Sequence, residues 1–300
     1  MKSVMMASQS IELGHREVML AGGFECMSKL PHYMYLRTAT GYGAAQAQDA
    51  IQSDGLTDVY NNILMGSCVE KICAEMNISR EAQDEYAIES YTKARAAQQA
   101  GILDWEIIEV IQQTKKGEVK NNKDEECQKF FPDKFAGLKP AFAKNGTITA
   151  ANSSKINDGA VAFVLMSEEA AKSRGLKPLA RIVSYEDAGV APIDFGIAPA
   201  KACAKALKRA GLQLKDIEYH EINEAFSAVA LANIKLMDLD ITRVNVHGGA
   251  VALGHPLGAS GGRIMLSLMN VLRTKNARLG MASICNGGGG ASAIILERLN

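Results

Sequence analysis

The chain has 300 residues, 47% of them hydrophobic, which is enough to bury one large core or two smaller ones. Lysine plus arginine and aspartate plus glutamate both number 33, so the formal charge is zero and neither nucleic acid nor an anionic membrane surface is indicated as a partner. The longest apolar stretches, such as residues 159–166, are too short to span a bilayer, and we expect no membrane segment.

The cysteines also limit the class of protein. There are six, without C-x-x-C pairs, at Cys26, Cys68, Cys73, Cys127, Cys203 and Cys285. This scatter argues against a disulfide framework and a zinc knuckle and favours a reducing compartment. The first seven residues contain one lysine and a short apolar run but no small-residue cleavage site, so we expect no targeting peptide there.

The first predicted elements are a helix over residues 2–13 and a strand over 18–21 that leads into two glycines. Residues 27–148 exceed any ordinary loop and carry helices of their own, notably at 79–100, so we expect an inserted lobe. A strand at 160–166 and a short helix at 168–174 then close the first half of the chain.

From residue 179 onward, strand-like and helix-like segments alternate. The predicted strands are 180–185, 217–222, 244–246, 279–284 and 291–296, and the predicted helices are 199–210, 224–237 and 260–273. Such alternation predicts a mostly parallel sheet with helices on both faces, because parallel neighbours need crossover connections. The helix, strand and glycine run at the start resemble those at 260–290, so we expect two similar halves, the first of them incomplete.

Reactive or polar side chains follow predicted strands in four turns of small residues. These are Asn223-Glu224-Ala225-Phe226, His247-Gly248-Gly249-Ala250, Gly254-His255-Pro256-Leu257-Gly258 and Cys285-Asn286-Gly287-Gly288-Gly289-Gly290. Ligand sites of α/β sheets lie beyond the carboxyl ends of strands, so the four turns can meet in one crevice. Glycine lets backbone N–H groups point at an oxygen that gains negative charge, as in thioester or enolate chemistry.

Cys285 and His255 are the natural reactive pair, since histidine exchanges protons near neutral pH and a neighbouring cation lowers the pKa of a thiol. Each candidate also has a structural interpretation. Cys285 could be an inert buried cysteine, His255 a turn histidine, and Asn223 the N-cap of the next helix. No glycine run has the spacing of a nucleotide-binding loop. The co-occurrence of the turns favours catalysis.

In this order and spacing, the four turns strongly resemble the signature segments of the thiolase superfamily. The resemblance implies an α/β fold of two similar mixed-sheet halves in an α-β-α-β-α layering, with an inserted lobe and an incomplete first half. The expected parts are a remnant of the N-terminal half at 1–26, the inserted loop domain at 27–148, the return strand and helix at 149–178, and the C-terminal half at 179–300.

The resemblance further implies a reversible Claisen condensation of two acetyl-CoA molecules to acetoacetyl-CoA and CoA, through an acyl-cysteine. His255 would activate that cysteine, Cys285 would shuttle the α-proton, and Asn223, through a water, would join His255 in an oxyanion hole. In the family, the nucleophile precedes the helix that here begins at Met1, so we expect it to be missing and the chain alone to be inactive. A non-catalytic CoA-ester-binding subunit and a 3-ketoacyl-CoA thiolase of longer-chain specificity are the alternatives.

Binding residues are carried over by the same resemblance. Contacts with coenzyme A are implied for four residues: Ser154, Tyr91, Lys129 and Lys134. Similarity to the mitochondrial acetoacetyl-CoA thiolase branch implies a possible potassium ion at Tyr91, Ala150, Ala151, Ser153 and Val251. No covalent cofactor is expected. A homodimer or homotetramer in the mitochondrion, or otherwise the cytoplasm, is the implied assembly and location.

Overall fold

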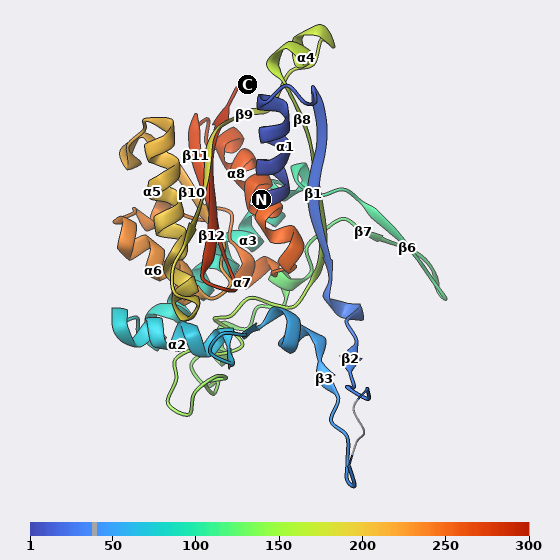
Figure 1. Cartoon of the computed structure of the whole chain (residues 1–300), viewed down its shortest axis with the longest axis vertical. Helices are drawn as coiled ribbons and strands as arrows, with labels where there is room; N and C mark the ends of the chain where they lie inside the picture. The colour runs from blue at the N-terminus through green and yellow to red at the C-terminus, as the bar shows by residue number, and fades with distance from the viewer. Residues whose placement is uncertain (38–40, 300) are drawn as a thin grey trace.

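Two sheets enclose a layer of two helices in the computed structural model, which describes residues 1–37 and 41–299 (Figure 1). The helices are α1 (Lys2–Glu12) and α8 (Leu257–Thr274). One sheet pairs β1 (Val18–Cys26) with β8 (Asp158–Met166), antiparallel. The other has the order β10-β11-β12-β9, with β9 (Ala180–Gly189), β10 (Tyr219–Ile222), β11 (Leu279–Asn286) and β12 (Gly290–Arg298).

The four-stranded sheet is mixed, as the family resemblance implies, and the expectation of a mostly parallel sheet is wrong. Only β10 and β11 pair in parallel, because the glycine turn folds β12 back against β11 and β9 then adds antiparallel to β12. The predicted strand at 244–246 does not form. Val244 makes a single bridge to His220, and Asn245 has a φ of 46°, which ends the extended conformation.

The strand β12 faces a helix layer on each side. Ala293 and Ile295 pack against α5 (Ala198–Ala210), whereas Ile294 and Leu296 pack against α1 and α8. This is the two-residue period of a strand that is buried on both faces. Helix α5 presents mostly alanine to the sheet and ends at Gly211, whose left-handed φ of 67° suits a helix C-terminus.

The central helices join the two sheets into one core. Met5 of α1 and Leu268 of α8 are almost fully buried and belong to one apolar cluster with Ile294. Burial of each such side chain contributes roughly 1.5–3 kcal/mol. The helices approach closely at Gly261, where an added Cβ would lie 2.6 Å from the backbone nitrogen of Met1. Any larger residue at position 261 would push the two helices apart.

The segment between β1 and β8 supplies two longer helices and three small hairpins. The helices are α2 (Met65–Met76) and α3 (Arg80–Gln99). The hairpins pair β2 (His32–Tyr33) with β3 (Gln48–Asp49), β4 (Thr57–Asp58) with β5 (Ile63–Leu64), and β6 (Val110–Thr114) with β7 (Gly117–Asn121). The β2–β3 and β6–β7 hairpins reach away from the body, as Figure 1 shows. Among the described residues, no helix is both long and apolar enough to cross a membrane.

The remaining helices are α4 (Glu168–Ser173), α6 (Ser227–Met237) and α7 (Ala250–Leu253). Helix α6 begins three residues later than expected, so the interpretation of Asn223 as its N-cap is wrong. Phe226 is extended, with φ −143° and ψ 150°, and it forms an isolated bridge with Ser153. The backbone N–H of Ser154 also donates to the carbonyl of Ala225 at 3.0 Å. Residues 150–155, which lead from the inserted lobe back to β8, are called the return segment below. Pairing with this return segment keeps residues 223–226 out of the helix.

Candidate active site

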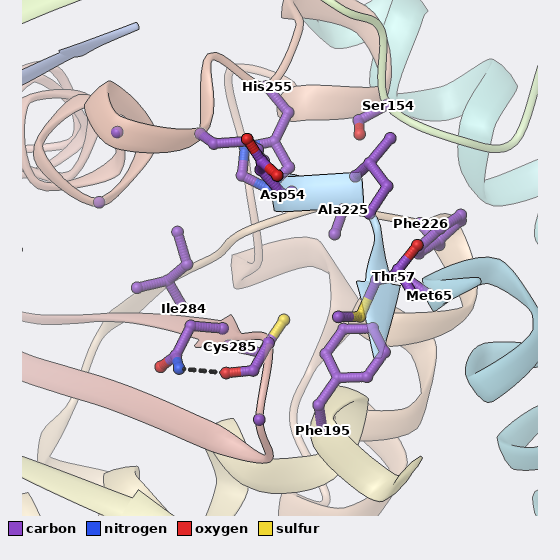
Figure 2. Close-up of a pocket in the computed structure, with 18 of the residues that line it drawn as sticks. Asp54, Thr57, Met65, Ser154, Phe195, Ala225, Phe226, His255, Ile284 and Cys285 are labelled. Atoms are coloured by element: carbon purple, nitrogen blue, oxygen red, sulfur yellow. Dashed lines mark hydrogen bonds between the residues drawn. The ribbon is translucent and has the colours of Figure 1, made fainter. Parts of the chain in front are cut away.

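A pocket of about 1000 Å³ lies between the start of α1, the return segment and the carboxyl end of β11 (Figure 2). His255, Cys285 and Ser154 all line it. Its apolar wall is made by Met65, Phe142, Phe195, Ala225, Phe226 and Ile284. The structure thus brings the predicted cysteine and histidine to one cavity. The third predicted residue, Asn223, does not appear in the lining, but its Nδ2 contacts the ring of His255.

His255 is held by hydrogen bonds from three segments of the chain. Its backbone N–H donates to the carbonyl of Lys155 at 3.0 Å. On the ring, Nε2 lies 3.1 Å from Nδ2 of Asn223, and Nδ1 lies 2.6 Å from Oγ of Ser260. The preceding Gly254 has a φ of 98°, and an added Cβ would clash with Asn157, so only glycine can direct the histidine this way.

The hydroxyl of Ser260 selects the tautomer of His255. Its Oγ lies within hydrogen-bonding distance of both the carbonyl of Pro256, at 2.9 Å, and Nδ1 of His255. One hydroxyl proton cannot serve both acceptors. The hydroxyl donates to Pro256, and Nδ2 of Asn223 can only donate to Nε2, so Nδ1 carries the ring proton in this structure. The other tautomer, with its proton on Nε2, provides the N–H that an oxyanion requires; it forms when the hydroxyl turns to Nδ1 and the amide of Asn223 turns away from the ring.

Burial sets the charges at this site. It lowers the pKa of His255 to about 4, and the nearby Arg263 acts in the same direction. It raises the pKa of Cys285 to about 12. At pH 7 both groups are therefore neutral, a thiol and an imidazole. The idea that an imidazolium lowers the pKa of the Cys285 thiol is wrong for this state, because a buried site disfavours both charges. Proton exchange remains available to the pair.

Cys285 is the second-last residue of β11, and its sulfur points into the pocket in Figure 2. The turn that follows depends on glycine. Gly288 and Gly289 have φ values of 83° and 85°, and a Cβ at position 289 would clash with the carbonyl of Val190. The tight turn lets β12 return beside β11 and leaves the cysteine at the rim of the sheet.

Glu224, next to Asn223, is buried and accepts hydrogen bonds from several segments, a role that the sequence did not predict. One carboxylate oxygen accepts hydrogen bonds from Tyr86 at 3.0 Å and Asn245 at 2.9 Å. The other accepts from Ser90 at 2.7 Å and from the backbone N–H of Val251 at 3.1 Å. Glu224 thereby ties α3 and α7 to the strand end that carries Asn223. Four neutral donors satisfy its charge in place of a lysine or arginine.

The coenzyme A residues expected from the sequence divide into two groups. Ser154 lines the pocket, as a contact to the substrate arm requires. Lys129 and Lys134 do not appear in its lining. Lys129 forms an ion pair with Glu126 at 2.5 Å, and the ammonium of Lys134 lies 4.7 Å from the ring centroid of Phe131. The role of these two lysines in binding coenzyme A remains a prediction.

The five residues expected to hold potassium do come together, but they do not fit the ion. Tyr91, Ala151 and Val251 belong to one cluster. The ammonium of Lys155 already donates to the carbonyls of Ala150, at 2.6 Å, and Ser153, at 2.8 Å. A lysine thus binds two of the oxygens that the resemblance assigns to the ion. Nor do the described residues contain a cluster of three histidine, cysteine or acidic side chains able to hold a metal.

Sequence reasoning missed Ser260, Lys155 and the apolar wall of the pocket. Ser260 could have been noticed as a hydroxyl five residues after His255, at the start of a helix. The apolar wall left no signal, because Met65 and Phe195 are distant in sequence and resemble ordinary core residues. His247, from the second of the four turns, does not line the pocket; its Nε2 lies 3.3 Å from Oγ1 of Thr274.

Comparison with known proteins adds independent information. A family model described as the thiolase N-terminal domain matches residues 1–169, and one described as the thiolase C-terminal domain matches residues 176–298. The mitochondrial acetyl-CoA acetyltransferase of Mus musculus is 53% identical over 100% of this chain and 70% of its own. The probable acetyl-CoA acetyltransferase of Dictyostelium discoideum is 49% identical, over 100% and 73%.

Solved structures agree. The Acat5 thiolase from Ascaris suum, in complex with coenzyme A, has a TM-score of 0.93 and 47% identity, over 99% of this chain and 76% of that one. The human mitochondrial 3-ketoacyl-CoA thiolase has a TM-score of 0.95 and 39% identity over the same shares. These matches confirm the fold expected from the sequence. They do not support the expectation that the nucleophile is missing from the protein.

Proposed function

This chain belongs to the thiolase family of acyltransferases, which act on coenzyme A thioesters, and on that premise we propose that it serves the reversible condensation of two acetyl-CoA molecules to acetoacetyl-CoA and CoA. The curated relatives named acetyl-CoA acetyltransferase are 49 to 54% identical to it, and the solved acetyl-CoA acetyltransferase of Bacillus anthracis is 42% identical. The 3-ketoacyl-CoA thiolase is 39% identical, which favours the short acyl group. Their names also support a mitochondrial location, and the resemblance supports a homodimer or homotetramer.

The observation that carries the proposal is the contact of 3.1 Å between Asn223 and His255 in the pocket that Cys285 also lines. The α-proton of a thioester is only weakly acidic. Its removal therefore needs a base together with N–H groups that face the oxygen of the forming enolate. The attraction between these N–H groups and the enolate oxygen is strong here, because the site is buried and water screens the charge poorly.

The proposed steps assign one task to each residue. The thiolate form of Cys285 takes the α-proton and becomes the thiol that burial favours. The enolate oxygen accepts hydrogen bonds from the Nε2–H tautomer of His255 and, through a water, from Nδ2 of Asn223, which turns away from the ring to make room for that proton. The enolate carbon then attacks the carbonyl carbon of an acyl thioester. A carbon–carbon bond forms, and the C–S bond of that acyl group breaks to release a thiolate.

The carrier of the acyl group is the finer part of the proposal. The family resemblance assigns it to a second cysteine in a Cys-Ala-Ser-Gly turn. Cys285 is the one cysteine among the described residues that line the pocket. We therefore assign proton transfer, and not acylation, to Cys285. The two half-reactions can be measured separately.

The first experiment follows exchange of the α-protons of acetyl-CoA for deuterium by mass spectrometry, using the 300-residue protein. We expect exchange in the wild type and a loss of at least about 100-fold in Cys285→Ala. Cys203→Ala is the matched control, because Cys203 is also buried, its pKa is also raised to about 12, and it lies on α5 away from the pocket. No exchange in the wild type would contradict the proposal.

The second experiment measures thiolysis of acetoacetyl-CoA by CoA. Exchange without thiolysis would support the assignment of proton transfer to Cys285. Thiolysis in addition would confirm the enzyme activity. Binding of acetyl-CoA with neither reaction would favour the non-catalytic subunit instead.

A further inference from the structure

The side chain of Lys155 turns back onto the return segment from which it projects. Its ammonium donates to the carbonyl oxygens of Ala150, at 2.6 Å, and Ser153, at 2.8 Å. It also lies 5.8 Å from the ring centroid of Tyr91 on α3, as a cation–π partner. The positive charge therefore sits among oxygens and a π-face, as a small cation would.

An ammonium group and a monovalent metal ion compete for such a place. Rings of backbone carbonyls replace the hydration shell of potassium, and a lysine ammonium is a compact charge with three donors that can use the same oxygens. Two cations on the same pair of carbonyls would repel each other across a short distance. The carbonyls of Ala150 and Ser153 are therefore not free for an ion while Lys155 is bound.

The surroundings of Lys155 keep the ammonium in this position. Tyr91 is buried and stacks on Phe130, with a centroid separation of 5.1 Å.

The backbone of Lys155 connects this charge to the reaction site. Its carbonyl accepts the hydrogen bond from the backbone N–H of His255 at 3.0 Å. The preceding Ser154 lines the pocket, and its N–H donates to the carbonyl of Ala225, another lining residue, at 3.0 Å. Any movement of the segment 150–155 would therefore displace both the catalytic histidine and the pocket wall.

We propose that Lys155 is a positioning residue whose ammonium is a tethered cation: it takes the place of a monovalent metal ion and orders the segment that supports His255 and Ser154. The wild-type protein should then need no potassium to hold this segment. The cation inference stands on the contacts of Lys155 alone, and only its effect on CoA binding rests on the proposed function.

Thermal unfolding in equal concentrations of potassium chloride, sodium chloride and choline chloride at about pH 7 tests the inference. We expect the wild-type melting temperature to show no potassium-specific increase. Lys155→Ala removes the ammonium group and leaves the carbonyls of Ala150 and Ser153 without it. The melting temperature of this variant should fall in choline chloride and rise again in potassium chloride. Lys155→Met fills the space without charge and should melt lower in all three salts. Exposed Lys177→Ala is the control and should behave as the wild type.

A potassium-specific increase in the wild type would overturn the inference, as would a Lys155→Ala variant as stable as the wild type without potassium. If Lys155→Ala does not fold in any salt, Lys155→Met decides: stability equal to that of the wild type would overturn the inference, and lower stability would support it.

Calorimetric binding of CoA gives a separate readout. Lys155→Ala should bind about tenfold more weakly, and potassium should restore the affinity. If CoA does not bind the wild type while the melting results hold, the proposed function fails and the cation inference stands.

Discussion

The three predicted catalytic residues were recognisable because each stands in a short, distinctive motif. Their supporting partners were not. His255 contacts Ser260 through Nδ1 and the carbonyl of Lys155 through its backbone N–H. Ser260 left a local signal, as a hydroxyl five residues after His255, whereas the contact with Lys155 joins segments distant in sequence. A lysine is a common residue, and nothing in the local pattern distinguishes this one from others on the chain. At the scale of single residues, the sequence predicted a chemistry and only packing supplied the positions.

Ser260→Ala tests the tautomer argument. Removal of the hydroxyl takes away the acceptor of the Nδ1–H, so the Nδ1–H form of His255 should lose population in the free protein. It also takes away the donor that would hold the Nε2–H tautomer during the reaction, so α-proton exchange should fall by about tenfold, the value of one lost hydrogen bond. Nitrogen NMR of the imidazole reports the tautomer directly. Ser267→Ala, a buried serine of the same helix that donates to Glu106 at 2.8 Å, is the control. An unchanged tautomer in Ser260→Ala would refute the assignment.

The short strand β10 contains a buried carboxyl group, that of Glu221, which the strand prediction did not anticipate. It was predicted within two residues of its start and ends at the predicted residue, yet Glu221 in its middle is buried rather than exposed. Neither carboxyl oxygen has a hydrogen-bond partner among the described residues, and the same holds for Nε and Nη2 of Arg263. Burial raises the pKa of Glu221 well above its usual value, although Arg263 acts in the opposite direction. Desolvation thus dominates at this position.

Glu221→Gln should stabilise the protein in a pH-dependent way. The pKa of Glu221 is higher in the folded than in the unfolded state, so the unfolded chain ionises first and the free energy of unfolding falls as pH rises above about 4.5. Glutamine at position 221 cannot ionise, so this contribution to the fall in the free energy of unfolding is absent from the variant. In urea unfolding, its advantage over the wild type should be small at about pH 5 and exceed ~1 kcal/mol at about pH 8.

Exposed Glu85→Gln serves as the control for this series and should follow the wild type at both pH values. An advantage of Glu221→Gln that does not grow with pH would show that Glu221 ionises normally in the folded protein.

At the scale of the whole molecule, the two-stranded sheet β1–β8 depends on the helices beneath it. Its inner side packs on α1 and α8 through residues such as Ala21 and Phe163. Its outer side exposes Leu20, Phe24 and Val164, at 73%, 78% and 64% of their surface. Two strands alone are marginally stable in water, so the helix layer supplies the support.

Exposed apolar surface of this kind should bind hydrophobic dyes and promote self-association. The double substitution Leu20→Thr and Phe24→Thr keeps the strand propensity and removes much of the patch. We expect lower fluorescence of bound anilinonaphthalene sulfonate and less light scattering at high concentration. Leu236→Gln, at a half-exposed leucine on α6, is the control and should change neither. Unaltered dye binding in the double variant would show that the face is not the adhesive surface.

Helix positions were largely predictable, since the apolar period of 3.6 residues and local caps decide them. Ser79 begins α3 as expected, because its hydroxyl accepts the hydrogen bond from the N–H of Ala82. Strand direction was not predictable. Alternation of strands and helices indicates crossovers, but the glycine turn after Cys285 made β11 and β12 a hairpin. Asn245 ended a predicted strand through a backbone conformation that its neighbours impose.

The sequence by itself determined the family and the central helices, and it predicted the cysteine, the histidine and the asparagine, because these depend on motifs and on periods within short segments. Only the tertiary structure decided that both reactive groups are neutral, that Ser260 contacts the histidine ring, and that a lysine ammonium lies where a metal ion was expected. The physical reason is that burial arises between segments distant in sequence, and that even the short-range contacts of Ser260 and Lys155 depend on a backbone geometry that packing sets.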